Sequence, residues 1–90
     1  MPNSTWTWVR VQRLAGFEPG TTHAFIIGDY FLHDANGVEQ VYTFYFMFDY
    51  ALDDAKHIVT KLLDAVQADA STHGWTTNRD MIYYTQLGRG

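Results

Sequence analysis

The segment 41–48, VYTFYFMF, is apolar at nearly every position, whereas a strand with one face in water alternates between apolar and polar residues. We interpret it as a β-strand that is covered on both faces. The segment 23–34, HAFIIGDYFLHD, has a similar composition and predicts a second strand. Asn36 and Gly37 lie between the two segments, and an Asn-Gly pair is the strongest short-range signal for a hairpin. The two strands are therefore expected to pair antiparallel.

A two-residue turn at Asn36 and Gly37 sets the register that we expect for this hairpin. Ala35 then lies opposite Val38, and counting outward places Tyr30 opposite Thr43. One face is expected to carry Phe25, Ile27, Asp29, Phe31, Tyr42, Phe44, Phe46 and Phe48. The other face is expected to carry Ile26, Gly28, Tyr30, Leu32, Val41, Thr43, Tyr45 and Met47. Apolar side chains thus dominate both faces of the hairpin.

The flanking segments predict two more strands. Residues 5–14, TWTWVRVQRL, mix β-branched and aromatic residues with arginine and glutamine, which is typical of a strand near a sheet edge. Pro19 and Gly20 suit the central positions of a type II turn, so residues 15–22 are expected to form a loop. Residues 79–87, RDMIYYTQL, predict the last strand, and a frayed tail follows it.

Residues 49–74 change to the period of an amphipathic helix. Apolar residues recur there at spacings of three and four, at Leu52, Ala55, Val59, Leu62 and Val66. Asp49 is the expected N-cap, and Gly74 is the expected stop. The order β-β-β-α-β predicts an α+β fold, with a four-stranded antiparallel sheet and one long helix packed on one face. A chain of this length suits one core, so residues 1–90 are expected to form a single domain.

Composition and charge limit the functional classes. Hydrophobic residues make up 47% of the chain, which argues against disorder, and the formal net charge of -4 disfavours direct binding to nucleic acid. The chain has no cysteine, so neither a disulfide framework nor a thiolate zinc site is expected. The sequence shows neither a secretory signal pattern nor an apolar run long enough to span a bilayer. We therefore expect a soluble, unexported cytoplasmic protein with no membrane partner.

No catalytic, cofactor-binding or metal-binding site is expected. His23, Asp29 and His33 share a face, but at about 3.3 Å per residue Asp29 lies roughly 13 Å from His33 and roughly 20 Å from His23, too far for one metal ion. Asp53 and His57 are one helical turn apart, but two ligands do not make a metal site. No serine lies in the setting of an activated nucleophile. Asp29 is unusual in an apolar strand: either a bulge or backbone donors satisfy its carboxylate, or it has a raised pKa that would suit catalysis.

One helix can cover only one face of the predicted sheet. Its aliphatic stripe is expected to pack on the face with the phenylalanine side chains, which leaves the face with Tyr30 and Tyr45 open. Tyr, Trp and Met are enriched at protein interfaces, and a second copy is the simplest cover for an open apolar face. We therefore predict a homodimer. The aromatic and apolar surface expected to bind a partner consists of Trp6, Trp8, Tyr30, Thr43, Tyr45 and Met47.

The predicted helix segment is acidic. Residues 49–70 contain Asp49, Asp53, Asp54, Asp64 and Asp69, but only Lys56 and Lys61 as basic residues. An acidic ridge that includes Asp53, Asp54 and Asp64 would dock on a basic surface of another protein, even one built to bind nucleic acid. An ordinary solvated helix face explains the same charges.

These observations favour a non-catalytic protein–protein interaction module, an adaptor or inhibitor that acts by surface occlusion. Small acidic inhibitors encoded by phages and mobile elements act in this way, and the chain fits that anti-defence kind. Two alternatives stay open. If the tryptophan and tyrosine side chains line a roomy cleft between subunits, the dimer would bind a flat small molecule. The other alternative is a small enzyme that uses Asp29.

Overall fold

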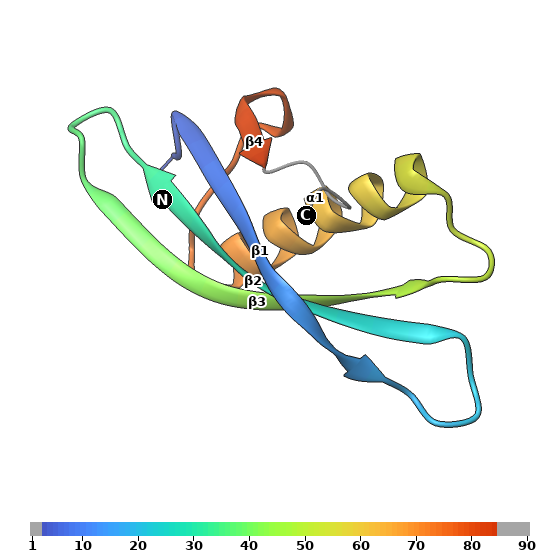
Figure 1. The fold of residues 1–90 in the computed structure, drawn as a ribbon. Helices are drawn as coiled ribbons and strands as arrows, with labels where there is room; N and C mark the ends of the chain where they lie inside the picture. The colour runs from blue at the N-terminus through green and yellow to red at the C-terminus, as the bar shows by residue number, and fades with distance from the viewer. Residues whose placement is uncertain (1–2, 85–90) are drawn as a thin grey trace.

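The computed structural model describes residues 3–84, and within that range the chain forms four β-strands, one α-helix and one 3-10 helix (Figure 1). Their bounds are β1 Trp6–Phe17, β2 His23–His33, β3 Glu39–Asp49, α1 Ala55–Thr72, η1 Arg79–Met81 and β4 Ile82–Tyr84. The strands form one sheet in the order β3-β2-β1-β4. Within it, β2 pairs antiparallel with both β1 and β3.

The predicted α+β class and the β-β-β-α-β order are confirmed, but the sheet is mixed rather than wholly antiparallel. β4 pairs in parallel with residues Thr7–Val9 of β1. The reason is that the chain after α1 returns to the end of the sheet where β1 begins, as a parallel bridge between Asn3 and Thr76 shows. β4 begins only at Ile82 because η1 precedes it, and the predicted end of this strand at residues 85–87 lies outside the described residues.

β1 is longer than the predicted segment and has two different environments. Two β-bulges, at Gln12 and Ala15, let it follow β2 as far as Phe17. β4 pairs with the first half of β1 on the side away from β2. The half after Val9 has no strand on that side among residues 3–84. The predicted position near a sheet edge therefore holds for the second half only.

The predicted turn at Pro19 and Gly20 is confirmed, but the loop is shorter than the predicted 15–22, because residues 15–17 belong to β1. Gly20 has a φ of 77°, in the left-handed region that suits glycine. The Thr21 amide donates a hydrogen bond to the Glu18 carbonyl at 3.3 Å, which closes the turn.

The β2–β3 hairpin closes through a longer loop than the two-residue turn that we predicted. The Asp34 carboxylate accepts hydrogen bonds from the backbone amides of Asn36 and Val38, each at 2.9 Å. This loop shifts the pairing of the two strands by one residue. Because side chains alternate along a strand, a shift of one residue moves every β2 side chain to the opposite face relative to β3.

α1 begins later than the pattern predicted. Its N-cap is Asp54, whose carboxylate accepts a hydrogen bond from the His57 amide at 2.9 Å. Asp49 does not cap the helix but is the last residue of β3, where a hydrogen bond from the Thr22 hydroxyl lowers its pKa. Leu52 also precedes the helix and is 80% exposed, so it is not part of the apolar stripe.

The predicted end of α1 at Gly74 is confirmed. Gly74 has a φ of 84°, and its amide donates to the Ser71 carbonyl at 3.0 Å. The Trp75 amide donates to the Ala70 carbonyl at 2.9 Å, which completes a Schellman motif. This turn directs the Trp75 ring into the core.

The core lies between α1 and one face of the sheet, and Figure 1 shows the helix on that side only. Its buried members are Val9, Tyr30, Leu32, Phe44, Phe46, Leu62, Val66, Ala70, Trp75 and Ile82. Leu62 and Val66 confirm the central part of the predicted helix stripe. Tyr30 lies opposite Tyr42 rather than Thr43, so the assignment of faces was right for β3 and wrong for β2.

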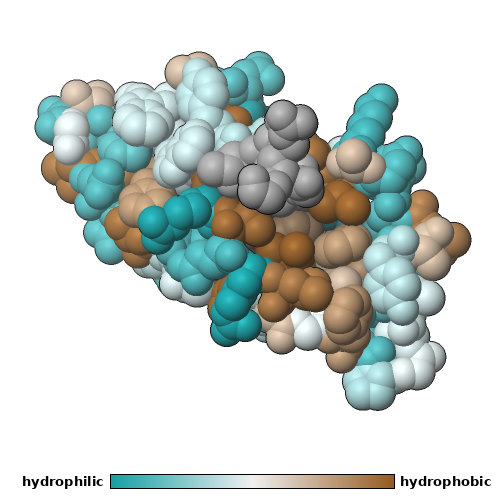
Figure 2. Space-filling view, viewed as in Figure 1, coloured by the Kyte–Doolittle hydropathy of each residue, from teal (hydrophilic) through white to brown (hydrophobic). Residues whose placement is uncertain are grey.

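The sheet extends beyond the helix that covers it. The molecule measures 46 × 24 × 18 Å, and its radius of gyration of 13.6 Å exceeds the value of about 12 Å that is typical for this length. In Figure 1 the hairpin of β1 and β2 projects past α1 at the lower right. Leu14, Phe17 and Tyr50 are exposed in this region, and Figure 2 shows apolar side chains gathered along it.

Candidate protein-binding surface

The sheet face away from α1 has no covering layer among the described residues. We call it the open face. It carries Trp6, Trp8, Arg10, Phe25, Ile27, Asp29, Phe31, Val41, Thr43, Tyr45 and Met47. With strands about 4.8 Å apart and about 20 Å of strand length, its projected area is on the order of 300 Å², comparable to the largest apolar patch of a typical monomer, which is often functional.

Most of the residues predicted for the partner surface lie together on the open face. Trp6, Trp8, Thr43, Tyr45 and Met47 come from two strands on either side of β2, and all are exposed. Tyr45 is the most accessible of them, at 72%. The predicted exposure of Tyr30 was wrong: this residue is 0% exposed and lies beneath α1, because of the one-residue shift in register.

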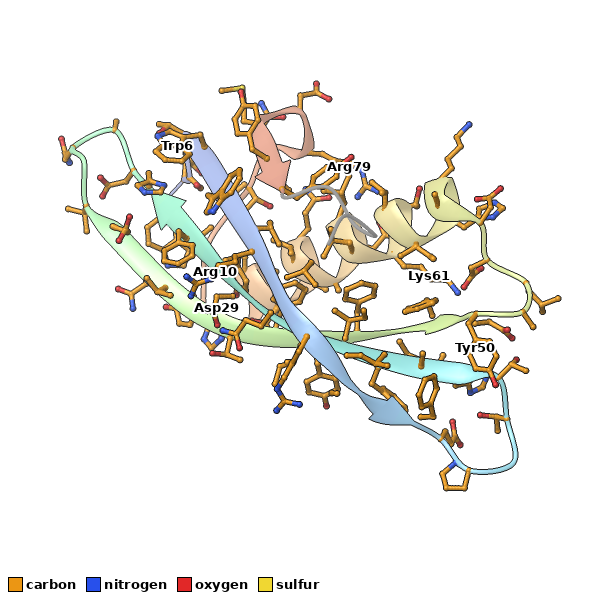
Figure 3. The ribbon with its side chains drawn as sticks, in the orientation of Figure 1. Trp6, Arg10, Asp29, Tyr50, Lys61 and Arg79 are labelled. Carbon is orange, nitrogen blue, oxygen red and sulfur yellow. The ribbon has the colours of Figure 1, made fainter. Side chains whose placement is uncertain are left out.

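Asp29 lies at the centre of the open face and is only 7% exposed. Its carboxylate accepts hydrogen bonds from Arg10 Nη2 at 2.8 Å, from Thr43 Oγ1 at 3.1 Å and from Gln12 Nε2. The bulge at Gln12 allows two β1 side chains to reach one carboxylate. Figure 3 shows Arg10 and Asp29 side by side on the sheet.

The electrostatic setting of Asp29 answers the question that the sequence left open. The Arg10 guanidinium holds the pKa of the Asp29 carboxyl below its usual range, although burial acts in the opposite direction. The alternative of a raised pKa is therefore wrong. The carboxylate is satisfied by side-chain donors from the neighbouring strands, at a bulge of β1.

Aromatic contacts fix the side chains at the end of the open face where β1 begins. The Trp6 and His33 rings stack with 3.6 Å between their centroids, and His33 Nε2 lies 2.8 Å from the Glu39 carboxylate. The Arg10 guanidinium lies 5.5 Å from the centroid of the Phe31 ring. These contacts order side chains that a partner would meet, which lowers the entropy cost of binding.

A shallow hollow of about 420 Å³ lies at the other end of the open face. Its lining residues are Ala15, Gly16, Phe17, Phe25, Ile27 and Tyr45. None of them is charged, so the hollow suits an apolar side chain or a flat ring rather than a polar substrate.

Contacts within the chain neutralise much of the predicted acidic ridge. Asp53 accepts a hydrogen bond from Lys61 Nζ at 2.5 Å, its side chain is 13% exposed, and Lys61 lowers the pKa of Asp53. Asp64 pairs with Arg79 Nη1 at 2.8 Å. Asp54 caps α1. The side chains of Asp54 and Asp64 stay largely in solvent, with exposed fractions of 68% and 65%.

Sequence reasoning missed Arg10, Gln12 and Phe31 as members or neighbours of the open face, whereas Val41 was expected on it. The alternation of β1 did contain a signal, because Arg10 shares the parity of Trp6 and Trp8. Placing Arg10 opposite Asp29, however, requires the register of β1 on β2, and two bulges hide that register from the sequence.

The described part of the chain offers no assembled metal site, since residues 3–84 contain no group of three potential His, Cys, Asp or Glu ligands. Comparisons of the chain with protein-family models, with curated proteins and with solved structures found no match. Within residues 3–84, no helix has the length and hydropathy needed to cross a membrane.

Proposed function

We propose that the protein is a non-catalytic protein–protein interaction module, an adaptor or inhibitor that covers a surface of its partner with the open face. The observation that carries this proposal is a sheet with one helix layer, whose other face exposes Trp6, Trp8, Tyr45 and Met47. Tyr, Trp, Met and Arg are enriched at the centres of protein interfaces, where a few such residues supply most of the binding energy.

The polar centre of the open face supports the same function. The Arg10–Asp29 pair is already formed, so a partner that covers it need not order these two side chains. The Arg10 side chain remains 55% exposed and has further N–H donors, which suit a carbonyl or carboxylate of the partner. The surrounding rings would exclude water from that contact.

A second copy of the chain is the simplest partner, and we propose a homodimer through the open face. A two-fold axis buries the same patch on both copies. The centre of the face carries one cation and one anion, so two copies can meet there without bringing only like charges together. Assembly would also remove the exposed Tyr45 and Trp8 side chains from water.

The two alternatives have weaker support. The hollow beside Tyr45 is open and lies within one subunit, and its lining offers few polar groups that would orient a small ligand. For acid–base catalysis, a pKa near the working pH is best, whereas Arg10 keeps the pKa of Asp29 low. Both features favour a binding function over these alternatives.

Analytical ultracentrifugation at micromolar concentration tests the proposed homodimer. The wild-type chain should sediment as a dimer, and Tyr45→Asp and Trp8→Asp should sediment as folded monomers, because each buries a charge in the apolar interface. Leu52→Asp is the matched control, since Leu52 is an exposed apolar residue outside the open face. A monomeric wild-type chain, or a Leu52→Asp variant that dissociates as readily as the other two, would contradict the proposal.

A further inference from the structure

The outer edge of β3 presents backbone hydrogen-bonding groups. β3 is the first strand of the sheet, and among residues 3–84 it pairs with β2 alone. The Tyr50 amide donates to the Thr22 carbonyl at 3.0 Å at one end of the hairpin, and the Asp34 amide donates to the Val38 carbonyl at 3.1 Å at the other. These two pairs fix which residues of β3 bond to β2.

Hydrogen-bonded pairs alternate along an antiparallel ladder. Because Tyr50 and Val38 both bond toward β2, the even-numbered residues of β3 do so as well. The odd-numbered residues therefore direct their N–H and C=O groups away from the sheet. They are Val41, Thr43, Tyr45 and Met47.

Nothing in the sequence of β3 protects this edge from another strand. Edge strands are commonly blunted by charged side chains, by proline, by bulges or by short length. Residues 40–48 contain neither a charged residue nor a proline. The pairing of β3 with β2 runs from Glu39 to Asp49 without a bulge. The edge is thus a regular template for one more strand.

A groove of about 410 Å³ lies between this edge and α1. It is lined by Thr43, Phe44 and Tyr45 from β3 and by Ala65, Ala68, Asp69 and Thr72 from α1. The helix side chains are small, so α1 borders the edge without closing it. Asp69 adds a negative charge, and its side chain is 34% exposed. Its carboxylate accepts the Tyr30 hydroxyl and has further lone pairs for a donor from outside.

The charges of this site decide between a second copy and a different protein. β3 itself contains no lysine or arginine and has Glu39 and Asp49 at its ends. Antiparallel pairing of two β3 strands would bring these acidic ends toward each other and would add no lysine or arginine to Asp69, which lies 3.5 Å from His73 Nε2 of its own helix. An extended apolar segment with a lysine or arginine complements both the apolar lining and Asp69.

We propose that β3 and α1 form a binding site for an extended segment of a partner protein. The segment adds to the edge of β3 as a further strand, places an apolar side chain over Ala65 and Ala68, and directs a lysine or arginine to Asp69. This is recognition by strand addition, in which the backbone supplies affinity and the groove selects side chains. The site shares Thr43 and Tyr45 with the open face, but the outward backbone groups of β3 and the α1 side chains that form it lie at the edge of the sheet. The site therefore does not depend on the function proposed above.

A phage-displayed library of short random peptides, selected on the wild-type chain, tests the site. The selected peptides should combine apolar residues with a lysine or arginine. Thr43→Pro removes an outward N–H and Ala68→Trp fills the groove, and each should weaken binding by at least about tenfold. Thr43→Val is the matched control, because it loses the same hydroxyl as Thr43→Pro but keeps the N–H. Circular dichroism checks that each variant folds. If Thr43→Pro does not fold, Ala68→Trp still tests the site.

Backbone methylation of the selected peptide separates strand addition from docking through side chains alone. Two forms are made, each N-methylated on alternate amides. Only one set of alternate amides in an added strand faces β3, so one form should lose binding and the other should keep it. Equal binding of the two forms would overturn the proposal.

Other results also overturn the strand-addition site. A library that yields no binder would overturn it. Peptides that bind the Ala68→Trp variant with the same affinity as the wild type would also overturn it. Binding that Trp8→Asp abolishes while Ala68→Trp preserves it would place the peptide on the open face. That result would rule out the β3 site and would not contradict the proposed function. Conversely, a monomeric chain that binds peptides at β3 would rule out only the proposed homodimer.

Discussion

The Tyr30 hydroxyl donates a hydrogen bond to Asp69 Oδ2 at 2.5 Å, between β2 and the last turns of α1. Burial of the Tyr30 ring, followed by this contact with a carboxylate, raises the pKa of Tyr30 far above its usual value. Asp69 also lies 3.5 Å from His73 Nε2, and the His73 ring stacks on Tyr42 with 3.8 Å between centroids. A polar bridge therefore holds the end of the helix on the sheet, beside the apolar core.

Tyr30→Phe should lower the free energy of unfolding by about 1 to 2 kcal/mol. A hydrogen bond to a charged group contributes about 1.5 to 3 kcal/mol, and water can partly replace it at the half-exposed Asp69. Urea denaturation measures the change. Tyr83→Phe is the control, because Tyr83 is exposed, and it should alter stability by less than about 0.5 kcal/mol. A Tyr30→Phe change as small as that of the control would mean that this bond does not hold α1 on the sheet.

Leu62→Ala should lower the free energy of unfolding by about 2 to 5 kcal/mol, as for a buried leucine whose cavity cannot collapse. Leu62 is 0% exposed in the middle of α1. Leu52→Ala makes the same chemical change at a residue before the helix that is largely in solvent, and it should have little effect. Chemical denaturation of both variants checks the orientation of the helix. Similar losses for the two would contradict the packing described here.

Asp29→Asn should lower stability near pH 7, and the difference from wild type should shrink at about pH 3. The pKa of Asp29 in the folded chain lies below its ordinary value of 3.8. As the pH falls, the unfolded chain therefore takes up a proton first, and the stability supplied by the ion pair is lost as the pH falls through the lowered pKa. Asparagine cannot titrate, so the variant lacks this component.

Urea unfolding at both pH values measures the Asp29 effect. Asp80→Asn, at an exposed position in η1, is the control and should follow the wild type at each pH. If Asp29→Asn differs from wild type by the same amount at both pH values, the Arg10–Asp29 contact does not supply its stability through charge.

Much of the fold follows from periodicity that is visible in the sequence. The helix stripe through Leu62 and Val66 faces the core as predicted, and Gly74 ends the helix as predicted. In β3 the odd-numbered Tyr45 and Met47 are exposed, and the even-numbered residues face the helix. These features depend on local spacing, which a single sequence contains.

The register of the β2–β3 hairpin could not be obtained from the Asn36–Gly37 pair alone. The Asp34 carboxylate binds two backbone amides of the loop and so makes the loop longer. An aspartate at the first position of a turn that ends in glycine is a signal for such a loop, and it competed here with the two-residue turn. The consequence was large, because one residue of shift buried Tyr30 beneath α1 and placed Phe31 on the open face.

The centre of the open face depends on pairing between distant segments. Asp29 takes its donors from β1 and β3, and the β1 donors Arg10 and Gln12 reach it only because of a bulge. Sequence spacing therefore identified the aromatic members of the surface, such as Trp8 and Tyr45, but not the ion pair between them. The predicted start of α1 was wrong for a related reason. Asp49 and Asp54 are both residues that cap helices well, and only the tertiary contact of Asp49 with Thr22 distinguishes them.

Asp54 and Asp64 are the two members of the proposed acidic ridge whose side chains remain largely in solvent. We expect the double variant Asp54→Asn, Asp64→Asn to bind a selected basic peptide with a slower association rate and a flatter dependence on salt. Charges outside the direct contact act mainly on the rate of encounter, and salt screens them. Asparagine still caps a helix, so the variant should keep its fold. Asp53 is left unchanged, because its carboxylate holds Lys61 and the Asp49 amide.

Stopped-flow measurements over a range of salt concentrations provide the test. Glu18→Gln is the matched control, because Glu18 is exposed in the turn between β1 and β2, away from α1, and its loss changes the net charge with little change in the field at the groove. The double variant should slow association more than this control at low salt, and the two should converge at high salt as screening removes the long-range attraction. Dissociation rates should change little, since neither Asp54 nor Asp64 lines the groove.

Equal association rates for the double variant and the control would show that the charge of Asp54 and Asp64 does not guide the peptide. The attraction would then come chiefly from Asp69, which lines the groove, and Asp69→Asn should flatten the salt dependence of association.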